Sequence, residues 1–264
     1  MPPMVSGLLT HRRFIWQSAV GELRHRYAGT GLGVVWNVLH PLALIAVYSV
    51  VFTAIMSAQV DGVPGRFAYL LYLCSGLLPW LSFAECVTRG CNAFVENAMY
   101  LRKLPIPEQV FVARAAASST LGLAISFSLL LVLAPALGLR PSWHWLLLPL
   151  PLLALQALGL GVGLLLGTLN VFFRDVGQLL TIALQVVLWT APVVYLAKIL
   201  PEPFRRALPF HPLVPPLEAV RDLFLHHRLP EPWVCAAMTA WPAATLLASW
   251  AVFSKLRAEI RDLL

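Results

Sequence analysis

Long apolar stretches constrain this chain more than any other feature of its sequence. A helix needs about 20 predominantly apolar residues to cross the hydrocarbon core of a membrane. Hydrophobic residues make up 59% of the 264 positions and charged residues only 12%, whereas about a quarter of a typical soluble domain is charged. The sequence therefore predicts an all-α integral membrane protein with six transmembrane helices, at approximately 34–57, 67–88, 110–137, 145–169, 179–197 and 233–253.

The basic residues of the connecting segments predict how these helices are oriented. Lys and Arg are enriched in the cytoplasmic loops of membrane proteins. The turns at 58–66 and 138–144 carry one basic residue each, whereas the termini and the segment after residue 88 carry several. An even number of spans puts both termini on one side, and we expect that side to be the cytoplasm. The chain then divides into a cytoplasmic N-terminal segment 1–33, a transmembrane domain 34–253 and a cytoplasmic tail 254–264.

An amphipathic helix is predicted before the first span. Its apolar residues recur at helical spacing, and most of the neighbouring basic residues lie off their stripe, which consists of Trp16, Val20, Leu23 and Tyr27. A helix lying in the cytoplasmic interface of the membrane fits this pattern. A helix packed on a soluble domain is the alternative, although the chain contains no such domain. The segment that follows allows a tight turn into the first span through three glycines, Gly29, Gly31 and Gly33.

Proline interrupts the predicted helices. Pro79 in the second span and Pro192 in the fifth predict kinks or breaks, which are tolerated where neighbouring helices or water satisfy the freed carbonyl groups. Segment 198–232 contains eight prolines and cannot form one long helix. We expect a short amphipathic helix there that re-enters the outer leaflet at a pore mouth, or else a solvated loop. Its apolar stripe would be Leu217, Val220 and Phe224.

The sequence lacks the residues that several functions require. It contains no phosphate-binding GxxxxGK(S/T) loop, no HExxH and no GxSxG motif. Glu85 is the only acidic residue in the predicted spans, which argues against an ion-coupled carrier or a membrane-embedded hydrolase. The four cysteines lack metal-ligand spacing, so no metal or cofactor is expected. The net charge of +7 forms no basic stripe that would bind nucleic acid. Energy for transport would therefore come from another subunit.

The segment between Arg89 and Gln109 is the longest cytoplasmic connection between spans. Phe94, Asn97, Tyr100 and Leu101 lie at helical spacing and predict a short helix that presents aromatic and charged side chains to a cytoplasmic partner. A simple connecting helix is the alternative.

Two charged residues lie about one helical turn inside the predicted spans. Glu85 ends the second span and Arg114 begins the third. They could form an ion pair between the two helices, or each could reach the membrane interface separately.

Four segments, in order along the chain, resemble ABC-2-type permeases that export cell-surface polysaccharides. They cover nearly the whole chain from Glu22 onward: Glu22-Leu-Arg-His-Arg-Tyr with Leu32-Gly-Val-Val-Trp-Asn-Val-Leu-His-Pro41; Gly76-Leu-Leu-Pro-Trp80 with Glu96-Asn-Ala-Met-Tyr-Leu-Arg-Lys103; Asn170-Val-Phe-Phe-Arg-Asp175 with Ala191-Pro-Val-Val-Tyr195; and His211-Pro-Leu-Val-Pro-Pro-Leu-Glu-Ala-Val-Arg-Asp222. The family usually has Asn before proline where this chain has His40 and His211, so no role of that Asn is carried over.

The resemblance implies a half-transporter in the inner membrane of a bacterium. Two copies would form a homodimer around the pathway, and two copies of a separate ATPase, which bind ATP and Mg²⁺, would dock on the cytoplasmic face. The cargo would be a glycan linked to a lipid diphosphate, O-antigen first, with capsular glycans or teichoic acids as related cargoes. A coupling helix in the ATPase groove would include Glu96, Asn97, Tyr100, Arg102 and Lys103.

The resemblance also implies where the substrate would pass. Its diphosphate would enter near Arg24, Arg26 and Tyr27, since basic side chains attract phosphate; anchoring the topology is the alternative role. Aromatic faces would line the channel, or would instead form belts at the lipid headgroups, from Trp36, Tyr48, Tyr69, Tyr72, Trp80 and Phe83.

Two rival functions remain open at this point. One is an ABC-2 permease for a small lipid or drug, against which the N-terminal helix and the long outer segment argue modestly. The other is a membrane-embedded enzyme acting on polyprenyl lipids, which the lack of acids, bases and metal ligands within the spans disfavours.

Overall fold

The computed structural model describes residues 7, 9–25, 29–51, 65–103 and 106–263, and within these ranges the chain is helical and forms no strand. The all-α class predicted from the sequence is confirmed. The α-helices are α2 (Arg12–His25), α3 (Trp36–Val50), α4 (Ala68–Glu96), α5 (Ala98–Lys103), α6 (Gln109–Leu133), α7 (Pro149–Phe172), α8 (Val176–Thr190), α9 (Glu202–Ala207), α10 (Val214–Phe224) and α11 (Pro232–Leu263). Short 3₁₀ helices are η1 (Gly33–Val35), η3 (Trp143–Leu147), η4 (Ala197–Ile199) and η5 (Leu208–Phe210).

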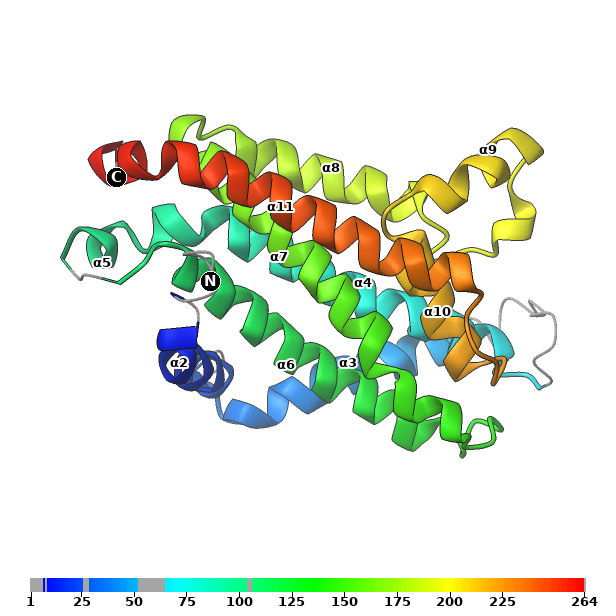
Figure 1. The fold of residues 1–264 in the computed structure, drawn as a ribbon. Coiled ribbons are helices and arrows are strands. Elements are labelled where there is room, and N and C mark those ends of the chain that lie inside the picture. The colour runs from blue at the N-terminus through cyan, green and yellow to red at the C-terminus, as the bar shows by residue number, and fades with distance from the viewer. Residues whose placement is uncertain (1–6, 8, 26–28, 52–64, 104–105, 264) are drawn as a thin grey trace.

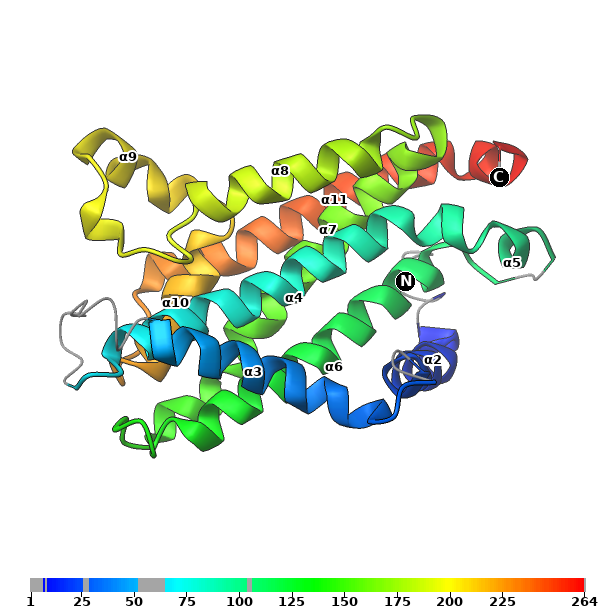
Figure 2. The same ribbon diagram turned by 180° about the vertical axis from the view of Figure 1, so that it is seen from behind.

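The long helices run side by side in one bundle (Figure 1). One end of the bundle, which we call the proximal end, carries α2, α5 and the C-terminal part of α11. The opposite end, the distal end, carries α9 and α10, as both views show (Figure 2). The middle of the bundle is α4, which packs against α6 and α7, while α11 packs against α7. The side chains of α4 are buried along most of its length.

Within the described residues, four helices are long and apolar enough to cross a membrane: α4, α6, α7 with the preceding η3, and α11. These confirm the predicted helices at 67–88, 110–137, 145–169 and 233–253. The apolar helices α3 and α8 have 15 residues each, or about 22 Å at 1.5 Å per residue, against about 30 Å of hydrocarbon. The predicted spans 34–57 and 179–197 are therefore not confirmed as membrane-crossing helices, and residues 52–57 lie outside the described ranges.

The two prolines within predicted spans have different effects. Helix α8 ends at Thr190 and not at the predicted 197; Pro192 follows two residues later, where its missing N–H and its ring disfavour a continued helix. Helix α4, in contrast, continues through Pro79 without a break. The second span therefore has no break at Pro79, while a break near Pro192 in the fifth is confirmed.

Two helices are longer at the proximal end than predicted. Helix α4 continues to Glu96, and α11 continues through the predicted boundary at 253 to Leu263. Both extensions bury apolar side chains in one cluster, which includes Phe94, Phe253 and Ile260. Burial of such side chains provides the stabilisation that holds these extra turns in helical form.

Close contact between α4 and α7 depends on glycine. A Cβ atom built on Gly90 of α4 would lie 2.8 Å from the Cα of Gly163 on α7, and Gly167 lies against the carbonyl of Gly90. Gly159 faces Cys86 one turn further along the same pair of helices. Small residues at intervals of four allow two helices to approach closely enough for backbone-to-backbone van der Waals contact. Gly161, on the opposite face of α7, allows a similar approach by α11 near Thr245.

A buried polar contact joins the three central helices at mid-bundle. Ser82 of α4 donates to the backbone carbonyl of Ser119 on α6 at 2.8 Å, and the amide of Gln156 on α7 donates to the Ser82 hydroxyl at 2.8 Å. In an apolar environment these groups would be costly to leave without partners. They therefore help to set the register of α6 and α7 on α4.

We expect Gly90→Ala to destabilise the protein by about 1–3 kcal/mol, because the added methyl group overpacks a backbone contact that cannot relax. The matched control is Gly122→Ala on α6, where a Cβ would meet no atom within 4 Å. Thermal unfolding in detergent should show a lower midpoint for the first variant and an equal or higher midpoint for the second. Equal midpoints for Gly90→Ala and the unmodified protein would contradict the glycine contact.

Candidate functional site

A short helix projects from the proximal end of the bundle. Helix α5 follows α4 after the single residue Asn97 and stands apart from the long helices (Figure 1). Met99 is 66% and Tyr100 57% exposed, and the cations Arg102 and Lys103 are exposed beside them. Exposed apolar surface bordered by charge is typical of a site that binds another protein. The structure therefore brings three of the predicted coupling residues together on one accessible element.

The opposite side of α5 is anchored in the bundle. Leu101 is 2% exposed and belongs to a buried cluster that also contains Phe94 of α4, Phe111 of α6 and Phe253 of α11. Protein interiors are packed too densely for one member of such a cluster to move independently. A displacement of α5 would therefore disturb a cluster to which three of the long helices contribute.

The two predicted coupling residues that precede α5 are in different environments. Glu96 is exposed at the end of α4. Asn97 is only 6% exposed: its amide donates to the carbonyl of Ala93 at 2.8 Å, and its Oδ1 accepts from Arg114 Nη2 at 3.3 Å. The Asn97 side chain thus closes the C-terminal end of α4 and is not presented to a partner in this conformation.

Arg114 and Glu85 do not form the ion pair that was one of the two sequence hypotheses. Arg114 bonds Asn97, whereas Glu85 accepts from Arg89 at 3.2 Å, one turn along the same helix. The spacing i, i+4 places two side chains of one helix face next to each other. Glu85 is therefore paired within α4.

Arg89 also connects the N-terminal helix to the bundle. It forms an ion pair with Glu22 of α2 and donates to the hydroxyl of Ser118 on α6 at 3.1 Å. Because these contacts are partly buried, they are screened less by solvent than a surface pair would be. Sequence reasoning missed Arg89 and Glu22 as a link between α2 and the spans.

The predicted N-terminal helix is present as α2, which lies across the proximal end and is seen nearly end-on in Figure 1. Ala19 is buried, and α2 packs mainly against α6. Trp16, on the predicted apolar stripe, is 58% exposed and is available to a membrane interface. Arg24 is exposed, while Arg26 and Tyr27 lie outside the described residues. The turn after α2 has positive φ at Gly29 and Gly33 (88° and 48°), as a glycine turn permits.

A second ion pair ties the coupling region to α11. Glu108, which immediately precedes α6, is 1% exposed and accepts from Arg257 Nε at 2.8 Å. A buried carboxylate requires a partner of opposite charge. The C-terminal extension of α11 thus supplies the cation for the segment that follows α5.

At the distal end, side chains satisfy the backbone where α8 breaks. The three successive carbonyls of Val193, Val194 and Tyr195 accept from Arg221 Nη2 (3.0 Å), the Tyr69 hydroxyl (2.6 Å) and the Tyr72 hydroxyl (3.0 Å), respectively. Irregular backbone is tolerated at membrane depth only where the protein or enclosed water satisfies it. This cluster of donors therefore allows the chain to leave the helix at Pro192.

The six aromatic residues predicted for a channel fall into two groups. Four of them on α4 have buried side chains: Tyr69, Tyr72, Trp80 and Phe83. The hydroxyl groups of the two tyrosines donate to the carbonyls of the segment after α8. The ring centres of Trp80 and Phe83 lie 5.8 Å apart in the core beside α7. Of these four, Tyr72 also borders a cavity. The remaining two, Trp36 and Tyr48 on α3, are partly exposed.

The predicted short helix in segment 198–232 is α10, and it is an internal element. Its apolar stripe of Leu217, Val220 and Phe224 is buried, as expected, but Arg221 and Asp222 on its charged side are buried as well. The Arg221 guanidinium lies 3.8 Å from the centre of the Tyr72 ring, a cation–π contact. A solvated loop is therefore not found for this part of the segment. The sequence shows three charged residues on this helix, Glu218, Arg221 and Asp222, but not that two of them would be buried.

The two histidines that replace the family's usual Asn differ in their surroundings. His211, just before α10, accepts from the backbone N–H of Leu213 through Nδ1 at 3.3 Å. An Asn side chain makes the same local bond in a turn, so His211 reproduces that contact. His40 is exposed on α3.

Comparison with known proteins places these features in a family. The sequence pattern of the ABC-2 type transporter family matches residues 13–225. The chain is also similar to proteins called O-antigen export system permease protein RfbA: one of Klebsiella pneumoniae, 25% identical over 92% of each chain, and one of Myxococcus xanthus, 28% identical over 98% of each chain.

A bundle that contains helices of membrane-crossing length and apolarity defines an integral membrane protein. The chain belongs to the ABC-2 type transporter family. It is a transporter subunit and a multi-pass protein of the inner membrane, and membership of this family implies an ATPase partner.

We expect Tyr69→Phe to lower stability by about 1–3 kcal/mol, because it leaves the carbonyl of Val194 without its donor in an apolar environment. Tyr100→Phe removes the same hydroxyl from an exposed ring on α5 and should change stability by less than about 0.5 kcal/mol. Thermal unfolding of both purified variants in the same detergent measures the difference. Two unchanged midpoints would show that the Tyr69 hydroxyl does not support the broken segment.

Proposed function

We propose that this chain is the permease subunit of an ATP-driven exporter that moves lipid-linked cell-surface polysaccharide, O-antigen in the first instance, across the inner membrane. The observation that carries the proposal is similarity to O-antigen export permeases over 92–98% of the chain. The similarity extends over both the proximal and the distal end of the bundle. A family match alone would leave the cargo open.

In this proposal the proximal end faces the cytoplasm, and α5 inserts into a groove of the ATPase. The exposed Met99 and Tyr100 supply apolar contact area, while Arg102 and Lys103 supply charge complementarity. ATP and Mg²⁺ bind to the ATPase subunits, and the motion they cause reaches the bundle through Leu101. Both termini of the permease then lie in the cytoplasm, in agreement with the distribution of basic residues.

The pathway forms between two copies of the chain. Helices α3 and α8 both contact α4 and present exposed apolar side chains. The exposed residues of α8 recur at helical spacing along one face: Leu179, Ile182, Val186 and Trp189. A second copy of the chain that covers these apolar faces would remove them from lipid and pack them against protein. In this proposal the working unit is a homodimer of the permease with two ATPase subunits.

The lipid diphosphate enters beside α2 in this proposal, near Arg24, Arg26 and Tyr27. A groove of about 280 Å³ lies between α3, α4 and α6, and Trp36, Asn37, His40 and Glu85 are among its lining residues. The Asn37 amide donates to the carbonyl of Leu23, which joins the start of α3 to α2 at 3.0 Å. The groove is lined mainly by apolar and uncharged polar groups together with the acid Glu85, so in this proposal the diphosphate itself lies outside the groove, at the exposed Arg24 of α2.

Deletion of the gene tests the cargo. We expect surface polysaccharide to disappear and lipid-linked polymer to accumulate inside the cell, because synthesis continues while export stops. Fractionation of the glycan into surface and membrane-associated pools, followed by restoration with a plasmid copy, measures this. Normal surface glycan in the deletion strain would refute the proposed cargo and favour a small lipid or drug.

The docking role of α5 predicts a specific loss of the ATPase. Reversing both charges, Arg102→Glu with Lys103→Glu, should reduce the ATPase recovered with the purified permease about tenfold, because like charges then face each other across the interface. The matched control is Arg205→Glu with Arg206→Glu, the same change on exposed α9 at the distal end. Membrane-inserted permease should be recovered equally from both variants, and equal ATPase recovery would contradict docking through α5.

A further inference from the structure

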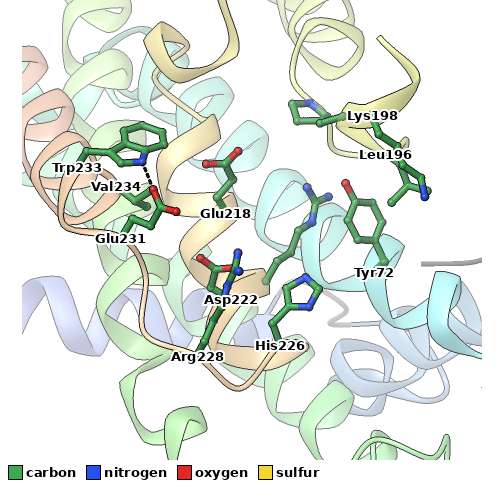
Figure 3. Close-up of a pocket in the computed structure, with 13 residues that line it drawn as sticks. Tyr72, Leu196, Lys198, Glu218, Asp222, His226, Arg228, Glu231, Trp233 and Val234 are labelled. Atoms are coloured by element: carbon green, nitrogen blue, oxygen red, sulfur yellow. Dashed lines mark hydrogen bonds and ion pairs between the residues drawn. The ribbon is translucent and has the colours of Figure 1, made fainter. Parts of the chain in front are cut away.

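A cavity of about 440 Å³ lies at the distal end, between α10, the start of α11 and the segment that follows α8. Small-ligand sites commonly have volumes of about 300–1,000 Å³. Two aromatic residues, Tyr72 and Trp233, lie on opposite sides of the cavity, and Glu218 lies between them (Figure 3). Trp233 is 40% exposed, and its indole N–H donates to Glu231 at 2.7 Å.

Hydrogen bonds and ion pairs within the protein hold the charged groups of the cavity in place. Arg221 is 6% exposed, bonds the carbonyl of Val193 and retains an Nε without a hydrogen-bond partner in the described structure. Asp222 accepts from Arg228 at 2.8 Å. Arg228 reaches it because His227 adopts a positive φ of 51°, which turns the chain sharply after α10.

The signs of the lining charges define which ligands fit. Lys198, Arg221 and Arg228 are cationic, and they are balanced by three carboxyl groups, Glu218, Asp222 and Glu231. An anion would meet the carboxylates and a cation would meet the guanidinium groups, while a hydrocarbon chain would strip water from all of them at high cost. No cluster of three or more His, Cys, Asp or Glu residues suited to a metal ion occurs in the described ranges. A neutral ligand rich in hydroxyl groups satisfies both kinds of charge, because a hydroxyl donates and accepts.

Two further groups suit the same ligand. Burial, followed by the nearby charge of Asp222, raises the pKa of Glu218, and its carboxyl oxygens accept hydrogen bonds from hydroxyl groups. Burial, together with the charge of Arg228, lowers the pKa of His226, which favours the neutral imidazole, a ring with one donor and one acceptor nitrogen. Trp233 adds an exposed aromatic face, against which the C–H groups of a sugar ring can pack.

We propose that this distal cavity binds uncharged sugar units of the glycan as it leaves the membrane. The inference rests on the proposed function for its choice of polymer, but it assigns a new contact site for the sugar portion, remote from the lipid diphosphate. Such a site holds the emerging chain at the outer side and opposes its return.

Binding of a lipid-free glycan tests the proposal. The probe is the neutral oligosaccharide released by mild acid from the surface polysaccharide of the host and labelled with a fluorophore. Its affinity is measured for the purified permease–ATPase complex in nanodiscs, with unlabelled oligosaccharide as competitor. We expect saturable binding that becomes about tenfold weaker in Trp233→Ala and in Glu231→Gln, each of which removes a group able to contact the sugar.

Two matched controls lie at the distal end but outside the cavity. Trp143→Ala removes an exposed indole from η3, and Glu202→Gln neutralises an exposed carboxylate on α9. Both should bind the probe as the unmodified protein does. Arg221 is left unchanged, because its substitution would also remove the hydrogen bond to the carbonyl of Val193 and so disturb the segment after α8.

The outcomes separate the cavity from the export function. No saturable binding, or equal affinity in the cavity and control variants, would overturn the proposal even if the deletion strain fails to export glycan. Competition by inorganic diphosphate would also overturn it, since that result defines an anion site. Conversely, normal surface glycan in the deletion strain would refute the proposed export function, whereas sugar binding that depends on the cavity residues would still support the cavity as a sugar site.

Discussion

Backbone contact between α4 and α7 is the constraint on which the remaining structure depends. In a membrane, lipid competes with apolar side chains, so helix association relies on close packing more than on the removal of water. Gly90 and Gly163 provide that closeness, and Gly161 extends it from α7 to α11. With α11, α7 and α4 held in this order, α6 is aligned through Ser82 and Ser119. The packing of these four helices therefore positions the two ends of the bundle, where the functional elements lie.

The distal end illustrates how a membrane protein can contain a helix break. Once Pro192 ends α8, three successive carbonyls need donors, and they receive them from Tyr69, Tyr72 and Arg221. Holding Arg221 for this purpose places a guanidinium at the edge of the cavity, and α10 brings Asp222 and Glu218 with it. The polar cavity is thus a consequence of the way the break is stabilised. The proximal end works differently, because α5 is exposed on one side and anchored by Leu101 on the other.

Several elements could be predicted because their signal is local. Helical spacing of apolar residues located α2, α5 and α10, and the missing phosphate-binding loop indicated that energy comes from elsewhere. The direction in which each side chain points was harder to predict from the sequence. Tyr72 and Trp80 are aromatic residues in a span, which suits a channel, but both are buried. Tyr72 donates to the carbonyl of Tyr195, far along the chain, and Trp80 belongs to a buried cluster with residues of α7. Asn97 has the spacing of a docking residue, yet its amide is used to close α4.

The sequence by itself determined that the chain is a helical membrane protein, where most of its spans lie and which family it resembles, because length, hydropathy and motif order are properties of neighbouring residues. Only the tertiary structure decided which charges are paired and which polar groups meet. Glu85 pairs with Arg89 and not with Arg114, and Arg221 joins α10 to the end of α8. The physical reason is that contacts between helices depend on the distance and angle between them, which here follow from glycine packing: Gly90 lies next to Arg89, and a Cβ on Gly76 would collide with Arg221 and the carbonyl of Val193.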